Sequence, residues 1–192
     1  MTEKYPDEDA RQLGIGGADL AGLKERLAGV AWDKGDIERG RKLYTQRGCA
    51  QCHGAASGLG PDLAGITGRF SRDDLFIAVA LPNRDVSPRY QTTLVETKEG
   101  KVYTGMIVYE AADGLLLRNG VNQTFRIETR DIESRRGLPI SLMPEGLLKD
   151  LHDGDLADLY SYLATFAART ASLEKVLDDK PLDGGDDDGE EL

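Results

Sequence analysis

Apolar residues at helical spacing mark four segments of the chain. Within each segment they recur three or four positions apart, which is the period of a helix that buries one face. The segments are residues 18–32, 37–44, 71–80 and 156–166. Polar residues able to cap a helix stand at the starts of the last three: Asp36, Ser71, and Asp153 or Asp155. In the second segment, Gly40 would let another element approach closely.

The pattern changes between residues 90 and 133, where β-branched and aromatic residues form short runs. Turn-forming pairs separate these runs at Glu99-Gly100, Asp113-Gly114 and Asn119-Gly120. The alternation predicts four or five antiparallel strands that form a small barrel or meander. The expected strands are residues 90–98, 101–110, 115–118 and 123–128, with a short edge near Ile132.

Composition and charge narrow the function classes. Of 192 residues, 40% are hydrophobic and 30% charged, which is ordinary for a soluble globular protein. The net charge of −10 belongs to the two ends, because residues 1–10 and 178–192 are rich in Asp and Glu. We expect no nucleic-acid partner, since phosphate binding needs clustered Lys and Arg. No stretch is apolar over the length that spans a bilayer, and the first residues lack the apolar core of a secretory signal.

Both cysteines of the chain lie in one pentapeptide, Cys49-Ala50-Gln51-Cys52-His53. This spacing, followed directly by histidine, is the attachment signature of c-type haem. Two thiols three positions apart can each bond a vinyl-derived carbon of one porphyrin, and the next imidazole then lies under the iron. We therefore predict one covalent haem c, held by Cys49 and Cys52, with His53 bound to the iron.

The motif has three other interpretations. A disulfide between residues three apart would close a small strained loop and leave His53 unexplained. A thioredoxin-like pair needs a βα pattern ahead of it, whereas a short helical segment precedes this motif. A zinc site needs a second pair of ligands, and His152 is the only other histidine or cysteine in the chain.

A glycine-rich loop follows the motif and contains Pro61, eight residues after His53. The stretch resembles small class I cytochromes c, in which the carbonyl of such a proline accepts the Nδ1 proton of the axial histidine. The resemblance implies that Pro61 orients His53 and raises its basicity. The alternative is a loop proline without this contact.

Electron carriers with one axial histidine usually take methionine as the sixth iron ligand, which raises the potential and blocks substrate access. Met1 is terminal and Met106 lies in a predicted strand, which leaves Met143. Prolines flank its segment, hold it out of a helix and restrict a loop that must deliver one thioether. We predict Met143 as the ligand. A core role for Met143, ligation by His152 and an open site are the alternatives.

Several stretches together resemble the haem-binding domain of planctomycete and verrucomicrobial proteins. They are GCAQCHG, GPDLAGITGRFSRDDL, ALPNRDVSPRY, GKVYTG and SLMPEGLL followed by DLADLYSYL, and the resemblance covers about residues 35–167. It implies that Met143 corresponds to the methionine of the family's SLMPEGL segment. It also implies that electrons arrive from a linked or docked oxidoreductase.

The PNRDVSPRY stretch is well marked in that family. Here it contains Arg84, Pro88, Arg89 and Tyr90. A guanidinium of Arg84 or Arg89 could pair with a haem propionate, although a solvated loop arginine fits equally well.

The expected fold class is α+β: a cytochrome c-like helical haem domain with an inserted small antiparallel β-barrel or meander. Residues 35–89 would form the first half with the haem motif, residues 90–133 the β-rich insertion, and residues 134–177 the second half with the methionine loop and the C-terminal helix. Residues 1–34 would be an N-terminal extension with one helix, and residues 178–192 an acidic disordered tail.

The expected function is single-electron transfer by a monohaem domain that is not itself an enzyme. Its partner would be a dehydrogenase-like donor or a cytochrome acceptor outside the cytoplasm, where haem is normally attached covalently, and a mature or truncated form would explain the missing signal. One alternative is a five-coordinate haem for gas sensing or peroxidatic chemistry, with His152 or Arg69 as loose distal candidates. Another is that residues 90–133 serve mainly to dock the domain to a partner.

Overall fold

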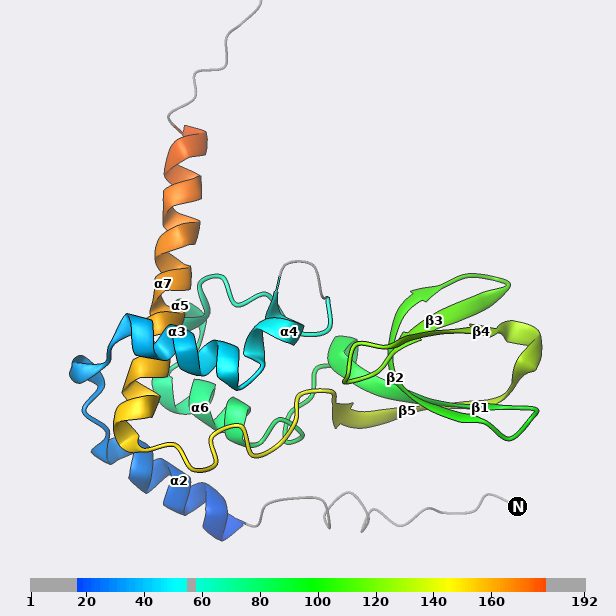
Figure 1. Cartoon of the computed structure of the whole chain (residues 1–192), viewed down its shortest axis with the longest axis horizontal. Coiled ribbons are helices and arrows are strands. Elements are labelled where there is room, and N and C mark those ends of the chain that lie inside the picture. Colours follow the sequence, from blue (N-terminus) through cyan, green and yellow to red (C-terminus); the bar gives the residue numbers. More distant parts are fainter. Residues whose placement is uncertain (1–16, 55–57, 179–192) are drawn as a thin grey trace, which may run out of the picture.

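The computed structural model describes residues 17–54 and 58–178, which form a helical unit and a five-stranded sheet (Figure 1). The helices are α2 (Gly17–Gly29), α3 (Ile37–Gln46), α4 (Cys49–His53), α5 (Ile66–Arg69), α6 (Arg72–Ala80) and α7 (Asp153–Asp178), with 3-10 turns η1 (Trp32–Lys34), η2 (Pro88–Tyr90) and η3 (Thr129–Asp131). The acidic ends predicted at residues 1–10 and 178–192 lie outside the described residues, apart from Asp178.

Two helices begin at the caps that the sequence predicts. The Asp36 side chain accepts a hydrogen bond of 2.8 Å from Arg39 N at the start of α3. At the start of α6, Ser71 Oγ accepts one of 3.1 Å from Asp74 N. Each side chain satisfies a backbone donor that has no partner within the helix.

Helix α7 is longer than the predicted segment 156–166, since it runs from Asp153 to Asp178. The Asp155 carboxylate accepts a hydrogen bond of 2.8 Å from His152 N, the backbone donor just ahead of the helix. This contact is the backward half of a capping box, and it fixes where α7 starts.

Helices α3 and α7 cross at very short range. A Cβ built on Gly40 would lie 2.0 Å from Asp158 O, so only a residue without a side chain fits at this crossing. A Cβ built on Gly35, just ahead of α3, would likewise lie 2.1 Å from Ala157 O of α7. Beyond the crossing, the Tyr44 and Tyr162 rings pack edge to face with their centroids 5.4 Å apart. The close approach predicted for Gly40 is therefore confirmed.

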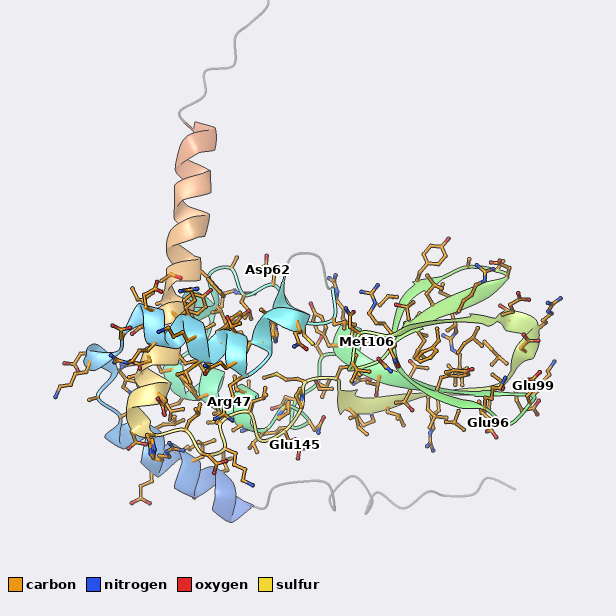
Figure 2. All side chains as sticks on the ribbon, in the orientation of Figure 1. Arg47, Asp62, Glu96, Glu99, Met106 and Glu145 are labelled. Atoms are coloured by element: carbon orange, nitrogen blue, oxygen red, sulfur yellow. The ribbon has the colours of Figure 1, made fainter. Side chains whose placement is uncertain are left out.

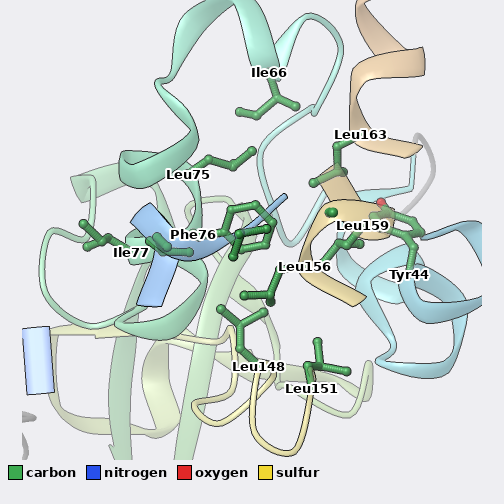
Figure 3. Close-up of a cluster of buried hydrophobic side chains, with 13 residues drawn as sticks. Tyr44, Ile66, Leu75, Phe76, Ile77, Leu148, Leu151, Leu156, Leu159 and Leu163 are labelled. Carbon is green, nitrogen blue, oxygen red and sulfur yellow. The ribbon is translucent and has the colours of Figure 1, made fainter. Parts of the chain in front are cut away.

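The core of the helical unit lies between α2, α3, α6 and α7. Figure 3 shows Phe76 of α6 beside Leu156 and Leu159 of α7, and all three are buried. The Trp32 ring of η1 packs against the Phe76 ring in a tilted arrangement, with a centroid distance of 5.2 Å. Other buried members are Leu27, Val30, Tyr44, Ile66, Leu75, Ile77, Leu148, Leu151 and Leu163. Residues far apart in the sequence thus fix α3 and α6, which flank the haem motif.

The sheet contains β1 (Gln91–Thr97), β2 (Val102–Glu110), β3 (Gly114–Arg118), β4 (Thr124–Glu128) and β5 (Ile132–Ser141). Its order is β4-β3-β2-β1-β5, with every neighbouring pair antiparallel. The first four strands form a meander, and β5 returns to pair with β1. The sheet is not closed, because β4 and β5 are its two edges, so the barrel alternative is not supported.

Strand β5 is ten residues long, and the prediction of a short edge near Ile132 is wrong. Its middle carries exposed Arg135 and Arg136, and Pro139 follows them, which together hide the alternation of a strand. An edge strand tolerates proline because one side of it needs no backbone donor. Residues 137–141, predicted as part of the methionine loop, therefore belong to the sheet.

The sheet has a hydrophobic cluster of its own. Val95, Leu115, Leu117 and Ile127 are buried in it, apart from the cluster of the helical unit. A core of this kind lets a small sheet support its own fold. Among the described helices, none combines the length and the apolar character needed to cross a bilayer.

Candidate functional site

The motif Cys49–His53 forms the short helix α4, which follows α3 almost directly (Figure 1). Gly48 separates the two helices in a left-handed conformation, with φ 75°, which glycine adopts without strain. Cys49 and Cys52 lie three positions apart on this turn, so they share one face. Neither cysteine is in a disulfide, both are half-buried, and burial raises the pKa of each thiol. They are therefore neutral thiols held side by side.

The His53 ring is fixed by the loop that follows it. Its Nδ1 lies 2.9 Å from Pro61 O, which is the contact implied by the resemblance to class I cytochromes c. The same loop is closed onto the motif by a backbone hydrogen bond of 3.0 Å from Gly60 N to Cys52 O. Because a carbonyl oxygen can only accept, the neutral ring carries its proton on Nδ1 and its lone pair on Nε2.

Gly60 packs directly against the His53 ring. A Cβ built on Gly60 would lie 2.8 Å from both Cε1 and Nδ1 of that ring. We expect Gly60→Ala to push the ring away from Pro61 O and to lower the free energy of unfolding by about 1–2 kcal/mol. Urea unfolding of the haem-containing protein measures the loss, and its optical spectrum reports the iron ligands.

Gly68→Ala is the matched control, because a Cβ on Gly68 would meet nothing within 4 Å. It should leave both the spectrum and the iron ligation as they are. If Gly60→Ala behaves like this control, the His53 ring is not held by close packing against residue 60.

These donors fit a c-type haem. Two thiols on one helical turn could hold the porphyrin through thioether bonds, and Nε2 of His53 suits the iron. The hydrogen bond from Nδ1 to a carbonyl is the kind of outer contact that orients a metal-binding histidine and raises its basicity. Within residues 17–54 and 58–178, no group of three His, Cys, Asp or Glu side chains is arranged to hold a metal ion.

Met143 lies on the segment between β5 and α7. Its side chain is half-buried, and its backbone N–H donates a hydrogen bond of 3.0 Å to Ser141 Oγ. Met106 is buried in β2, and Figure 2 shows it at the end of the sheet that is nearest the helical unit. Met143 as the sixth ligand remains a prediction.

The alternative distal candidates have other contacts. His152 stands at the start of α7, where its flanking residues Leu151 and Asp153 are both bound by Arg26 of α2. The Arg69 guanidinium donates a hydrogen bond of 2.8 Å to Asp62 O, next to Pro61. Arg69 thus supports the loop that holds His53.

The two arginines considered for a propionate also have neighbours of their own. Arg84 forms an ion pair of 3.2 Å with Asp85. The Arg89 guanidinium lies 5.8 Å from the centre of the Tyr90 ring. Both side chains are exposed. Their positions fit a solvated loop arginine as well as an arginine that pairs with a haem propionate.

Sequence reasoning missed Asn83. Its side chain is hydrogen-bonded to Ser141, the last residue of β5, and to Glu145, and these two residues stand on either side of Met143. Asn83 stands in the PNRDVSPRY stretch, but its partners lie about sixty positions further along the chain, so no local pattern reveals them. Its position directly after Pro82, in a turn, was the only local signal.

Residues 37–115 match the family model of cytochrome c. The match begins with α3, includes the Cys49–His53 motif and ends at Leu115 in β3, ahead of Met143. It supports a c-type cytochrome that works in haem-based electron transfer. The cofactor of this family is covalently attached haem c with its iron.

Proposed function

We propose that the chain is a monohaem electron carrier in which Cys49 and Cys52 attach the haem and His53 and Met143 are the axial ligands. The observation that carries the proposal is the 2.9 Å contact between His53 Nδ1 and Pro61 O. This acceptor fixes the tautomer of the His53 ring and leaves Nε2 as its basic nitrogen, which is the arrangement that an axial haem ligand needs.

Each residue has a distinct task in this proposal. The two thiols anchor the porphyrin, and Pro61 O keeps the Nε2 lone pair of His53 directed to one point. Haem iron, when bound, supplies a one-electron couple. The Met143 thioether would occupy the remaining iron position, raise the potential and exclude small ligands from it. Such a site passes electrons without binding a substrate.

The wider setting is part of the proposal. The resemblance of the PNRDVSPRY and SLMPEGLL stretches supports membership of the planctomycete and verrucomicrobial haem-binding family. On that basis the electron donor is a linked or docked oxidoreductase. We place the chain outside the cytoplasm, because haem is normally attached to such motifs there. None of the proposed haem ligands comes from the sheet. The sheet is therefore a candidate surface for docking that donor.

The test is the optical spectrum of the haem-containing protein with and without Met143. We expect oxidised wild type to show the weak near-infrared band of sulfur bound to iron, and Met143→Ala to lose it completely. The matched control is Met106→Leu, a volume-conserving change at the other internal methionine, which should keep the band.

The opposite results are equally clear. If wild type is high-spin and binds carbon monoxide readily, His/Met ligation is wrong, and a five-coordinate haem for gas sensing or peroxidatic chemistry becomes the leading function. If Met106→Leu removes the band and Met143→Ala does not, the ligand comes from the sheet instead.

A further inference from the structure

Asn83 joins the turn after α6 to both sides of Met143. Asn83 Oδ1 accepts a hydrogen bond of 2.9 Å from Ser141 N, and Asn83 Nδ2 donates one of 2.8 Å to Glu145 Oε1. Ser141 and Glu145 stand two positions before and two positions after Met143. One amide side chain therefore binds the chain on both sides of the methionine, and these two hydrogen bonds are called the bracket below.

The chemistry of the two partners requires an amide at this position. Ser141 N can only donate and the Glu145 carboxylate can only accept, so residue 83 must offer one acceptor and one donor at once. Aspartate supplies only the acceptor, and an aliphatic side chain supplies neither. Both contacts also settle which end of the Asn83 side chain is oxygen.

Asn83 is itself held in place. It follows Pro82 in a turn that is closed by a hydrogen bond of 3.1 Å from Arg84 N to Leu81 O. Leu81 N in turn donates to Ile77 O, at 2.8 Å, at the end of α6. Since Ile77 and its neighbours on α6 are buried in the helical core, the bracket rests on the rigid part of the unit.

The bracketed segment is also ordered from within. Ser141 Oγ accepts a hydrogen bond of 3.0 Å from Met143 N, so the same serine contacts both Asn83 and the methionine backbone. The hairpin turn between β3 and β4 adds a neighbour, because a Cβ built on Gly120 would lie 3.8 Å from Leu142 O. The Met143 backbone is therefore tied to α6 and lies beside the sheet.

We propose that Asn83 is the positioning residue for Met143: it holds the segment so that the thioether is presented to the iron without first having to be ordered. This inference rests on the proposed His/Met ligation. Ordering the segment in advance removes an entropy cost that the iron–sulfur bond would otherwise have to offset. Loss of Asn83 should thus weaken the hold of Met143 on iron while leaving haem attachment intact.

The experiment is displacement of Met143 by imidazole in the oxidised, haem-containing protein, followed through the near-infrared sulfur band. Each hydrogen bond of the bracket is expected to shift this equilibrium about fivefold, so Asn83→Ala should lower the apparent dissociation constant of imidazole about 25-fold. The control Ser71→Ala removes the N-cap of the same helix, α6, without touching the bracket, and should change the constant less than about twofold.

A second pair of variants keeps the inference testable if Asn83→Ala folds poorly. Asn83→Asp places two carboxylates together and should weaken Met143 binding at least as much as alanine does. Adding Glu145→Gln to it reverses the direction of the second bond only, because the new amide at position 145 can donate to the new carboxylate, which still accepts from Ser141 N. This double variant should return the imidazole constant to within about fivefold of wild type. Glu145→Gln alone keeps an acceptor for Asn83 and should have little effect.

The outcomes separate the two proposals. A wild-type protein without the sulfur band overturns His/Met ligation, and the role of Asn83 falls with it. A wild-type protein with the band, but with Asn83→Ala indistinguishable from Ser71→Ala, overturns the role of Asn83 alone. Failure of the double variant to recover from Asn83→Asp has the same meaning.

Discussion

Replacing Gly40 by alanine is expected to lower the free energy of unfolding by about 3 kcal/mol or more. The new Cβ would lie 2.0 Å from Asp158 O and 2.6 Å from Asp158 C. These are backbone atoms of α7 in the middle of a helix, so no side-chain rotation can relieve the overlap. The two helices would have to separate, although alanine is the better helix former.

The matched control is Gly22→Ala in α2, where a Cβ would meet nothing within 4 Å. That change should stabilise the protein by about 0.5–1 kcal/mol, since it gains helix propensity without a clash. Urea unfolding of the two variants beside wild type measures both changes. Equal behaviour of the two variants would show that α3 and α7 can separate freely at Gly40.

The crossing matters for the haem site because α3 leads directly into α4. Only Arg47 and Gly48 separate the end of α3 from Cys49. A shift of α3 away from α7 therefore moves the thiols and His53 relative to the loop that carries Pro61. We expect Gly40→Ala to disturb the iron ligation as well as the fold.

The helices were accessible from sequence because their signals are local. Apolar spacing located α2, α3, α6 and α7, and the caps at Asp36 and Ser71 are those observed. Strands β1 to β4 were also found, because the turn pairs at Glu99-Gly100, Asp113-Gly114 and Asn119-Gly120 mark their ends. Helix lengths and strand β5 were less accessible. No local sequence pattern indicates that β5 pairs with β1 and not with β4, the strand before it in the chain.

The residues of the site also fall into those that a local sequence pattern predicts and those that it does not. The Cys49–His53 motif is a local pattern, and the contact of Pro61 could be inferred through a resemblance. Asn83 and Asp158 were missed as functional or structural positions, because each acts on residues more than fifty positions away. Asp158 lies between Ala157 and Leu159, and a polar residue in an amphipathic helix is ordinarily assigned to its solvent face.

Removal of the Asp158 side chain is expected to be the second large loss of stability. The carboxylate is buried, with 3% of the residue exposed, and it accepts hydrogen bonds from Asp36 N at 2.6 Å and from Arg39 Nε and Nη2 at 2.6 and 2.8 Å. It thus ties α7 to the start of α3, beside the crossing at Gly40. We expect Asp158→Ala to lower the free energy of unfolding by about 3 kcal/mol, because it leaves the Asp36 N–H unpaired and removes two charge-assisted bonds.

The control for charge alone is Glu38→Ala, which breaks the exposed ion pair of Glu38 with Arg41 on the same helix. Exposed pairs of this kind contribute little, so its stability should stay close to that of wild type. If Asp158→Ala and Glu38→Ala lower the free energy of unfolding by the same amount, the buried contacts of Asp158 stabilise the protein no more than an exposed ion pair does.

The contribution of Asp158 to the free energy of unfolding should also depend on pH. The hydrogen bonds from Arg39, helped by the one from Asp36 N, lower the pKa of Asp158 below its usual value, although burial acts in the opposite direction. A folded-state pKa below the unfolded one means that the stabilisation is fully present above the unfolded pKa, about 3.9, and is lost as the pH falls through the folded value. The difference in unfolding free energy between wild type and Asp158→Asn should therefore be constant from pH 7 to about pH 5 and shrink below about pH 4. Urea titrations at several pH values measure it, and a difference that persists unchanged in acid would mean that the charge of Asp158 does not stabilise the crossing of α3 and α7.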